Sequence, residues 1–133
     1  MKRVFIAIAF IFISVAVGIY SVNTTQRKCN RLISRINTAI ELSNEITEND
    51  NHNKRIKLYS LAKNLNEAWE SESEFFYFFF NNDDLKSIET NIEKIPIHTK
   101  NGDIESAYLC LVECSEEFEY LKNSIIPDLN NIF

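Results

Sequence analysis

The stretch VFIAIAFIFISVAVGIYSV, residues 4–22, decides the fold, because it contains no charged residue and is long enough to act alone. Two basic residues precede it and a polar segment follows it. At about 1.5 Å of rise per helical residue, the stretch matches the roughly 30 Å hydrocarbon core of a bilayer. We therefore expect a transmembrane anchor over residues 1–23 and one extracytoplasmic helical domain over residues 24–133.

A cleaved signal peptide is the competing interpretation of this stretch. Lys2 and Arg3 resemble the basic start of a signal, and residues 16–18 (AVG) have the small-x-small pattern of a cleavage site. The apolar residues continue to Val22 with no polar or helix-breaking segment before that site, which favours an uncleaved anchor. Secretion after cleavage stays as an alternative.

Basic residues lie on both sides of the stretch: Lys2 and Arg3 before it, and Arg27 and Lys28 after it. Counting positive charges therefore does not decide the orientation. A short basic head before a first hydrophobic segment is typical of an export signal, so we expect the N-terminus inside and the domain outside the cell membrane. The basic residues after the stretch are expected to reach lipid headgroups.

Composition limits what the domain can be. The formal net charge of -5 repels phosphate backbones, so we expect no nucleic-acid partner. The 133 residues include only two glycines and two prolines, too few for the turns of a sheet protein. We predict an all-α fold, in which the anchor helix continues outward into an antiparallel up-and-down bundle of about four helices.

Four stripes of residues at helical spacing support this prediction. The stripes are Leu32 or Ile33, Ile36, Ile40, Ser43 and Ile46; Leu58, Leu61, Leu65, Ala68 or Trp69, Glu72, Phe76 and Phe79; Leu85, Ile88, Ile92 and Ile95; and Ile104, Ala107 or Tyr108, Leu111, Cys114 or Ser115, Phe118, Leu121 and Ile125. The predicted structural core includes Leu65, Trp69, Leu111 and Phe118. Residues 47–53 should separate the first two helices, and residues 81–84 and Asp103 should cap the last two. Pro96 is expected to kink or end the third helix.

Six consecutive aromatic residues end the second predicted helix: Phe75, Phe76, Tyr77, Phe78, Phe79 and Phe80. On a helix they point in all directions, and three interpretations stay open. Phe76, Phe79 and Phe80 fill the bundle; the run forms an exposed patch that docks a partner; or the run forms an aromatic belt at the membrane interface. The interpretation as an aromatic belt is considered because this end of the second helix is expected to return toward the membrane.

The cysteines do not complete a metal site. Cys110 and Cys114 share a helix face, but neither His52 nor His98 has the spacing to add ligands, and zinc normally takes four. We expect buried thiols that pack as small apolar groups. Cys29 is a candidate for a disulfide with a second copy of the chain.

No pattern indicates an enzyme. The densest group of carboxylates is Glu113, Glu116, Glu117 and Glu119, which we interpret as a solvated helix face. A di-iron bundle requires Glu-x-x-His, and neither histidine has a glutamate three residues before it. Phosphate loops, nucleophile elbows and zinc-protease helices are missing. We therefore expect no catalytic residue, cofactor or metal.

The segments LNEAWE (residues 65–70), DLKSIE (residues 84–89) and AYL (residues 107–109), in this order after a membrane helix, resemble the bacterial domain of unknown function 4363 family. The resemblance covers the full length. It departs at Asn82, where a His is expected, and because Asn also caps helices we expect a structural role there. The resemblance implies a membrane-anchored helical protein of spore-forming or related Gram-positive bacteria and no assigned activity.

We expect a non-catalytic accessory or structural interaction subunit of a membrane complex at the cell surface, with residues 75–80 as the first candidate contact. Its partners would be the lipid bilayer and another membrane protein or a second copy. The alternative is a sensor-like ectodomain with a small ligand in a polar cavity between helices. A thiol-based redox protein would need exposed cysteines of lowered pKa. The apolar residues 125–133 should lie near the membrane or fold over the base of the bundle.

Overall fold

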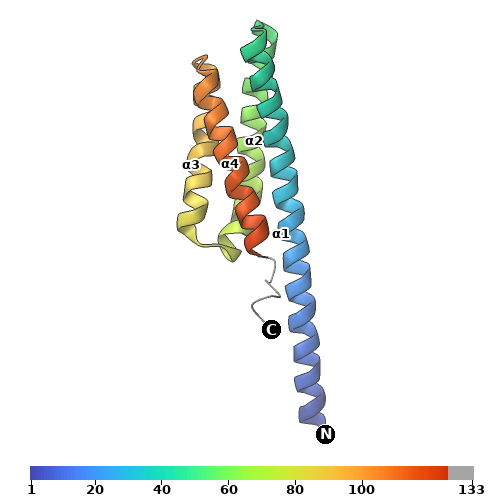
Figure 1. The fold of residues 1–133 in the computed structure, drawn as a ribbon. Coiled ribbons are helices and arrows are strands. Elements are labelled where there is room, and N and C mark those ends of the chain that lie inside the picture. Colours follow the sequence, from blue (N-terminus) through green and yellow to red (C-terminus); the bar gives the residue numbers. More distant parts are fainter. Residues whose placement is uncertain (126–133) are drawn as a thin grey trace.

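The computed structural model describes residues 1–125, which form four α-helices and no strand. The helices are α1 (Lys2–Glu48), α2 (His52–Phe79), α3 (Asn82–Lys100) and α4 (Ile104–Ser124). Figure 1 shows that α1 extends well beyond the other three at its N-terminal end. The predicted all-α class, a helical bundle with a long apolar N-terminal helix, is confirmed.

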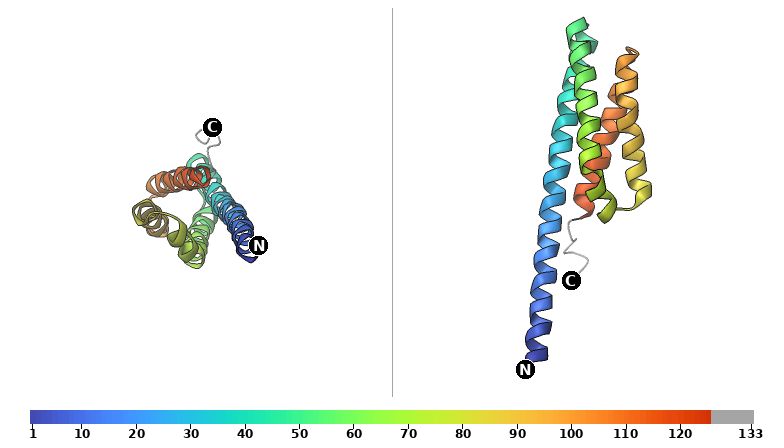
Figure 2. Two further views of the ribbon diagram at one scale, coloured as in Figure 1. Left: turned by 90° about the horizontal axis from the view of Figure 1, so that it is seen from below. Right: turned by 180° about the vertical axis from the view of Figure 1, so that it is seen from behind.

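The four helices form a ring in which each lies beside two others (Figure 2). α1 packs beside α2 and α4, and α3 packs beside the same two helices. Short loops make successive helices antiparallel, which is the predicted up-and-down arrangement. We call the end where α2 leads into α3 the base of the bundle, because it lies next to the apolar half of α1 (Figure 1).

An apolar core runs through the centre of the ring. The largest fully buried side chains are Trp69, Phe76, Phe118, Leu32, Ile36, Leu58, Leu65, Leu85, Ile88, Ile92, Ile95 and Leu111. Near the base the core is aromatic, because the ring of Trp69 lies 5.5 Å from that of Phe76 and 5.8 Å from that of Phe118. Leu65, Trp69, Leu111 and Phe118, which the stripes place in the core, are all buried.

Side chains from the loops cap the helices that follow them. The side-chain oxygens of Asn51 and Asn81 accept hydrogen bonds from the backbone N–H groups two residues later, and Asp103 accepts one from Ser106 at 3.1 Å. The cap predicted at Asp103 is therefore present, and the cap of α3 is Asn81. Residue Asn82, at which the resemblance departs, is the first residue of α3.

The structure corrects two details of the predicted helices. Pro96 does not end α3, which continues to Lys100 because Ile95 and Thr99 are buried and hold its last turns. Phe79 is 40% exposed and is not a core residue, because α2 ends there and its stripe leaves the bundle. The position expected for the apolar C-terminal segment falls almost entirely on residues 126–133, which lie outside the described part.

Candidate membrane-facing surface at the base of the bundle

The first half of α1 packs against no other part of the described chain. Every residue from 1 to 20 is exposed, including Phe5 at 69% and Phe12 at 71%, and the first buried residue is Thr25. The segment is long and apolar enough to cross a membrane, a property that signal sequences near an N-terminus share. The apolar side chains of this segment are therefore exposed on every side of the helix.

The polar side chains of this segment are satisfied within the helix. The hydroxyl of Ser14 donates a hydrogen bond to the carbonyl of Phe10 at 2.8 Å, and that of Ser21 donates to the carbonyl of Val17 at 2.8 Å. Such bonds to the preceding turn remove the need for water at these groups. The backbone of a helix is likewise satisfied internally, so the segment meets the requirements of a lipid environment.

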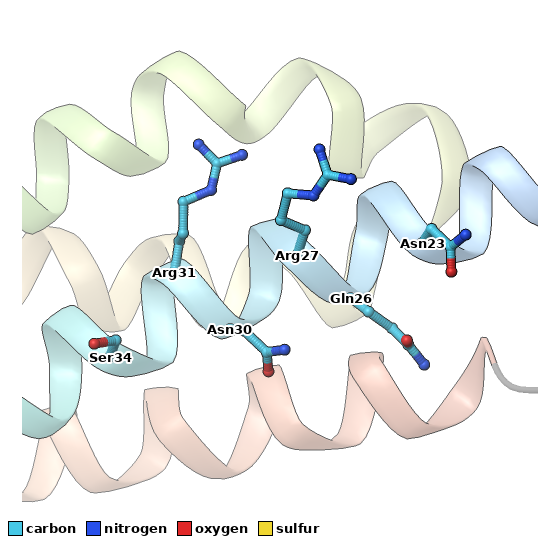
Figure 3. A pocket seen from close by; sticks show the side chains of 6 residues that line it. All are labelled: Asn23, Gln26, Arg27, Asn30, Arg31 and Ser34. Atoms are coloured by element: carbon cyan, nitrogen blue, oxygen red, sulfur yellow. The ribbon is translucent and has the colours of Figure 1, made fainter.

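A basic collar follows the apolar segment on α1 and consists of Arg27, Lys28, Arg31 and Arg35. Figure 3 shows Arg27 and Arg31 pointing toward α2, whereas Gln26 and Asn30 point toward α4. These side chains line an open groove of about 540 Å³, and all of its lining residues belong to α1. Arg27, Arg31 and Arg35 are exposed on the outer side of the bundle, whereas Lys28 is half-buried.

Lys28 connects the collar to the aromatic run on α2. Its Nζ pairs with the carboxylate of Glu72 and lies 5.0 Å from the centre of the Phe75 ring. An ammonium over an aromatic face is attracted by the ring electrons. These contacts fix which part of α2 lies beside the collar.

The aromatic run does not form one exposed face. Phe76 is fully buried against Trp69 and Phe118, so we correct its assignment as a partner contact to that of a core residue. Phe75, Tyr77 and Phe80 are half-buried. Only Phe78, at 82% exposure, and Phe79, at 40%, are freely accessible.

Phe75, Phe78 and Phe79 form a surface that we call the basal aromatic patch. The ring of Phe79 lies 4.8 Å from that of Phe75 and 4.9 Å from that of Phe78. On the other side of α2, the hydroxyl of Tyr77 donates a hydrogen bond to Glu89 at 2.8 Å, which raises the pKa of Tyr77. Tyr77 thus ties α2 to α3 and is not part of the patch.

The three cysteines are free thiols; Cys114 is buried as predicted, whereas Cys110 is only half-buried because it lies at the edge of the core. Burial raises the pKa of Cys29 to about 12 and raises the pKa of Cys114 as well, so both stay protonated at neutral pH. This is the opposite of what a redox protein needs. Cys29 is fully buried in the bundle, so the proposed disulfide to a second copy is wrong for the folded chain.

One carboxylate of the predicted solvated face is partly buried. Glu117 accepts a hydrogen bond from Ser87, and burial raises its pKa. Its Oε2 is buried and has no hydrogen-bond partner in the part of the chain that the structure describes. The neighbouring Glu113 accepts a hydrogen bond from Asn91 at 3.1 Å. Within residues 1–125 no three His, Cys, Asp or Glu side chains are grouped to hold a metal ion.

A further groove lies at the far end of the bundle. It has a volume of about 310 Å³ and is lined by His52, Arg55, Ile56, Tyr59, Thr99, Lys100 and Gly102. Arg55 there is held by Asp50 at 2.7 Å and by the carbonyl of Gly102 at 3.3 Å. The groove lies between the start of α2 and the end of α3 but is open to solvent, so it is not a cavity enclosed within the bundle core.

The basal aromatic patch was visible in the sequence only as a run of aromatics, and its relation to the collar depends on the pairing of α1 with α2. Comparisons of the chain with protein-family models, with curated proteins and with solved structures find no match. The resemblance to the domain of unknown function 4363 family stays a prediction.

Proposed function

We propose that this chain is a single-pass membrane protein whose extracytoplasmic bundle serves as a non-catalytic accessory or structural subunit of a membrane complex. The observation that carries the proposal is the continuity of α1, because one helix supplies both the apolar segment and one wall of the bundle. Its length, Lys2–Glu48, corresponds to about 70 Å at 1.5 Å per residue. The bundle would stand at a fixed height above the bilayer.

An interaction role fits the interior of the bundle better than a sensor role does. The core is filled with apolar side chains, and the two grooves described above open on the outer surface. A small-ligand site normally needs a concave pocket with a few converging polar groups. The bundle therefore supports recognition through its surface.

The proposed contact for a partner is the apolar segment of α1. All of its side chains from residue 4 to residue 20 are exposed, so they are available to the transmembrane helix of another protein or of a second copy. Gly18 has no atom within 4 Å of the position that a Cβ would take, so its surface is open to a neighbouring helix. Small residues let two helices approach closely in lipid.

Site-specific photocrosslinking in native membranes tests this function. A photoreactive residue at Phe12 is expected to give a protein adduct of one discrete mass, whereas the same residue at Ile56, also exposed but at the far end of the bundle, should not give that adduct. Intact mass should show the N-terminal segment retained in the membrane fraction. Lipid adducts alone at Phe12 would overturn the accessory role, and loss of residues 1–18 would establish the secreted alternative.

A further inference from the structure

We propose that the base of the bundle is docked on the headgroup layer of the bilayer that α1 crosses, with Phe78 and Phe79 inserted at the interface. This inference rests on the proposed anchoring and adds a second membrane contact to it. Of the interpretations left open for the aromatic run, it selects the bilayer over a protein partner for the exposed rings.

The height of the patch along α1 carries the argument. Lys28 touches both Glu72 and Phe75, so these residues of α2 are level with Lys28. α2 runs antiparallel to α1, and Phe79 lies one turn beyond Phe75, about 6 Å closer to the apolar segment. Val22 lies about 9 Å below Lys28 by the same rise. Phe79 is therefore within one helical turn of the level at which the apolar segment ends.

The two exposed rings offer apolar surface that a bilayer would cover. Phe78 is 82% exposed although the adjacent Phe79 ring packs against it at 4.9 Å. Aromatic side chains are enriched where the hydrocarbon core meets the headgroups. Removing a phenylalanine side chain from water is favourable. A bilayer crossed by α1 would supply this burial at the right height without any further partner.

The charges at the base indicate which edge of the bundle faces the headgroups. Arg27 and Arg31 form no ion pair within residues 1–125, and both point toward α2, the helix that carries the patch (Figure 3). Phosphate groups of lipids attract such side chains. Asp83 and Asp84 also lie at the base, but on α3, which does not pack beside α1. The α1–α2 edge is therefore the one that rests on the headgroups.

Tryptophan quenching by brominated lipid tests the docking in the full-length protein. Three variants each add one tryptophan at an exposed position: Phe78→Trp in the patch, Phe12→Trp in the apolar segment and Ile56→Trp at the far end of α2. Wild-type protein, in which Trp69 is 1% exposed, gives the baseline that is subtracted. Thermal melts of each variant in the same nanodiscs check that the fold is retained.

We expect Phe78→Trp to be quenched to an extent comparable to Phe12→Trp and several-fold more than Ile56→Trp. Quenching at position 12 without quenching at position 78 would overturn the docking and leave the anchoring intact. An unquenched Phe12→Trp would overturn the anchoring itself, and the docking with it. The three positions therefore separate a failure of this inference from a failure of the proposed function.

Discussion

Trp69 contains a polar group that the core leaves unsatisfied. The side chain is 1% exposed, and its Nε1–H has no acceptor among residues 1–125. Trp69→Ala should lower the free energy of unfolding by about 3–5 kcal/mol, because it leaves a cavity beside Phe76 and Phe118. Trp69→Phe should cost clearly less, because it also removes an unpaired donor whose burial costs about 1–3 kcal/mol. Urea unfolding followed by circular dichroism would measure both, and equal losses would contradict the role given to the N–H group.

Glu117 should make stability depend on pH. Burial raises its pKa in the folded chain above the ordinary value of 4.5, so its protonated form favours folding. The stability that this group contributes is present below about pH 4.5 and is lost as the pH rises through the raised pKa. Glu117→Gln should therefore melt at a higher temperature than wild type at neutral pH, and the difference should vanish toward pH 4.5.

Thermal melts across this pH range would measure the effect. Glu116→Gln is the matched control, since it removes a carboxylate from the exposed side of the same helix. A shift of equal size in both variants would point to net charge and not to the burial of Glu117. Ser87 should still donate its hydrogen bond to the amide oxygen of Gln.

At the scale of elements, the turn between α3 and α4 depends on Gly102. Its φ of 77° lies in the left-handed region, and the N–H groups of Gly102 and Asp103 bond to the carbonyls of Thr99 and His98. This is the Schellman pattern that ends a helix at a glycine. Gly102→Ala should cost about 1–2 kcal/mol, since an L-residue is strained there.

The geometry around this turn adds to the cost. A Cβ at position 102 would lie 3.0 Å from Nη1 of Arg55, so that side chain must also shift. Gly102→Asn is the informative control, because Asn tolerates the left-handed conformation better than Ala does. Denaturant titration should rank wild type above Asn and Asn above Ala in stability. Ala as stable as wild type would contradict the strain.

Helix faces were predictable from spacing, but helix ends and helix pairing were not. The stripe Leu85, Ile88, Ile92 and Ile95 is entirely buried, since residues at this spacing share one face. Phe79 belongs to a stripe by spacing, yet it is exposed because the stripe cannot show where neighbouring helices stop covering it. The spacing likewise cannot show that Lys28 meets Phe75, which depends on how α1 and α2 are aligned.

The predicted stripes also missed some buried residues inside the bundle. Ala39, Leu42 and Ala62 are buried although the predicted stripes omit them. A helix that packs between two neighbours has a buried face that is wider than a stripe of one residue per turn. Pro96 illustrates the converse, because a rule based on its missing N–H predicts a break that tertiary packing overrides. The packing of neighbours, and not the local signal, decided both cases.

At the scale of the whole molecule, α1 divides into a half that the bundle needs and a half that it does not. The boundary lies at Thr25, the first buried residue, just after the apolar segment. A bundle made only of residues 24–133 should therefore fold as well as the full chain. The rest of α1, up to Glu48, still packs against α2 and α4 in this shorter chain.

Two truncations test this division. The chain beginning at residue 24 should be highly helical and unfold in one cooperative transition, because none of the removed residues belongs to the buried core. The chain beginning at residue 34 should not fold, because it loses Cys29, Leu32 and Ile33 from the core. Deleting one large aliphatic side chain costs about 2–5 kcal/mol, and two such losses approach the whole stability of a small domain, about 5–15 kcal/mol. Circular dichroism melts would distinguish the two, and a chain beginning at residue 24 that fails to fold would show that the apolar segment stabilises the bundle.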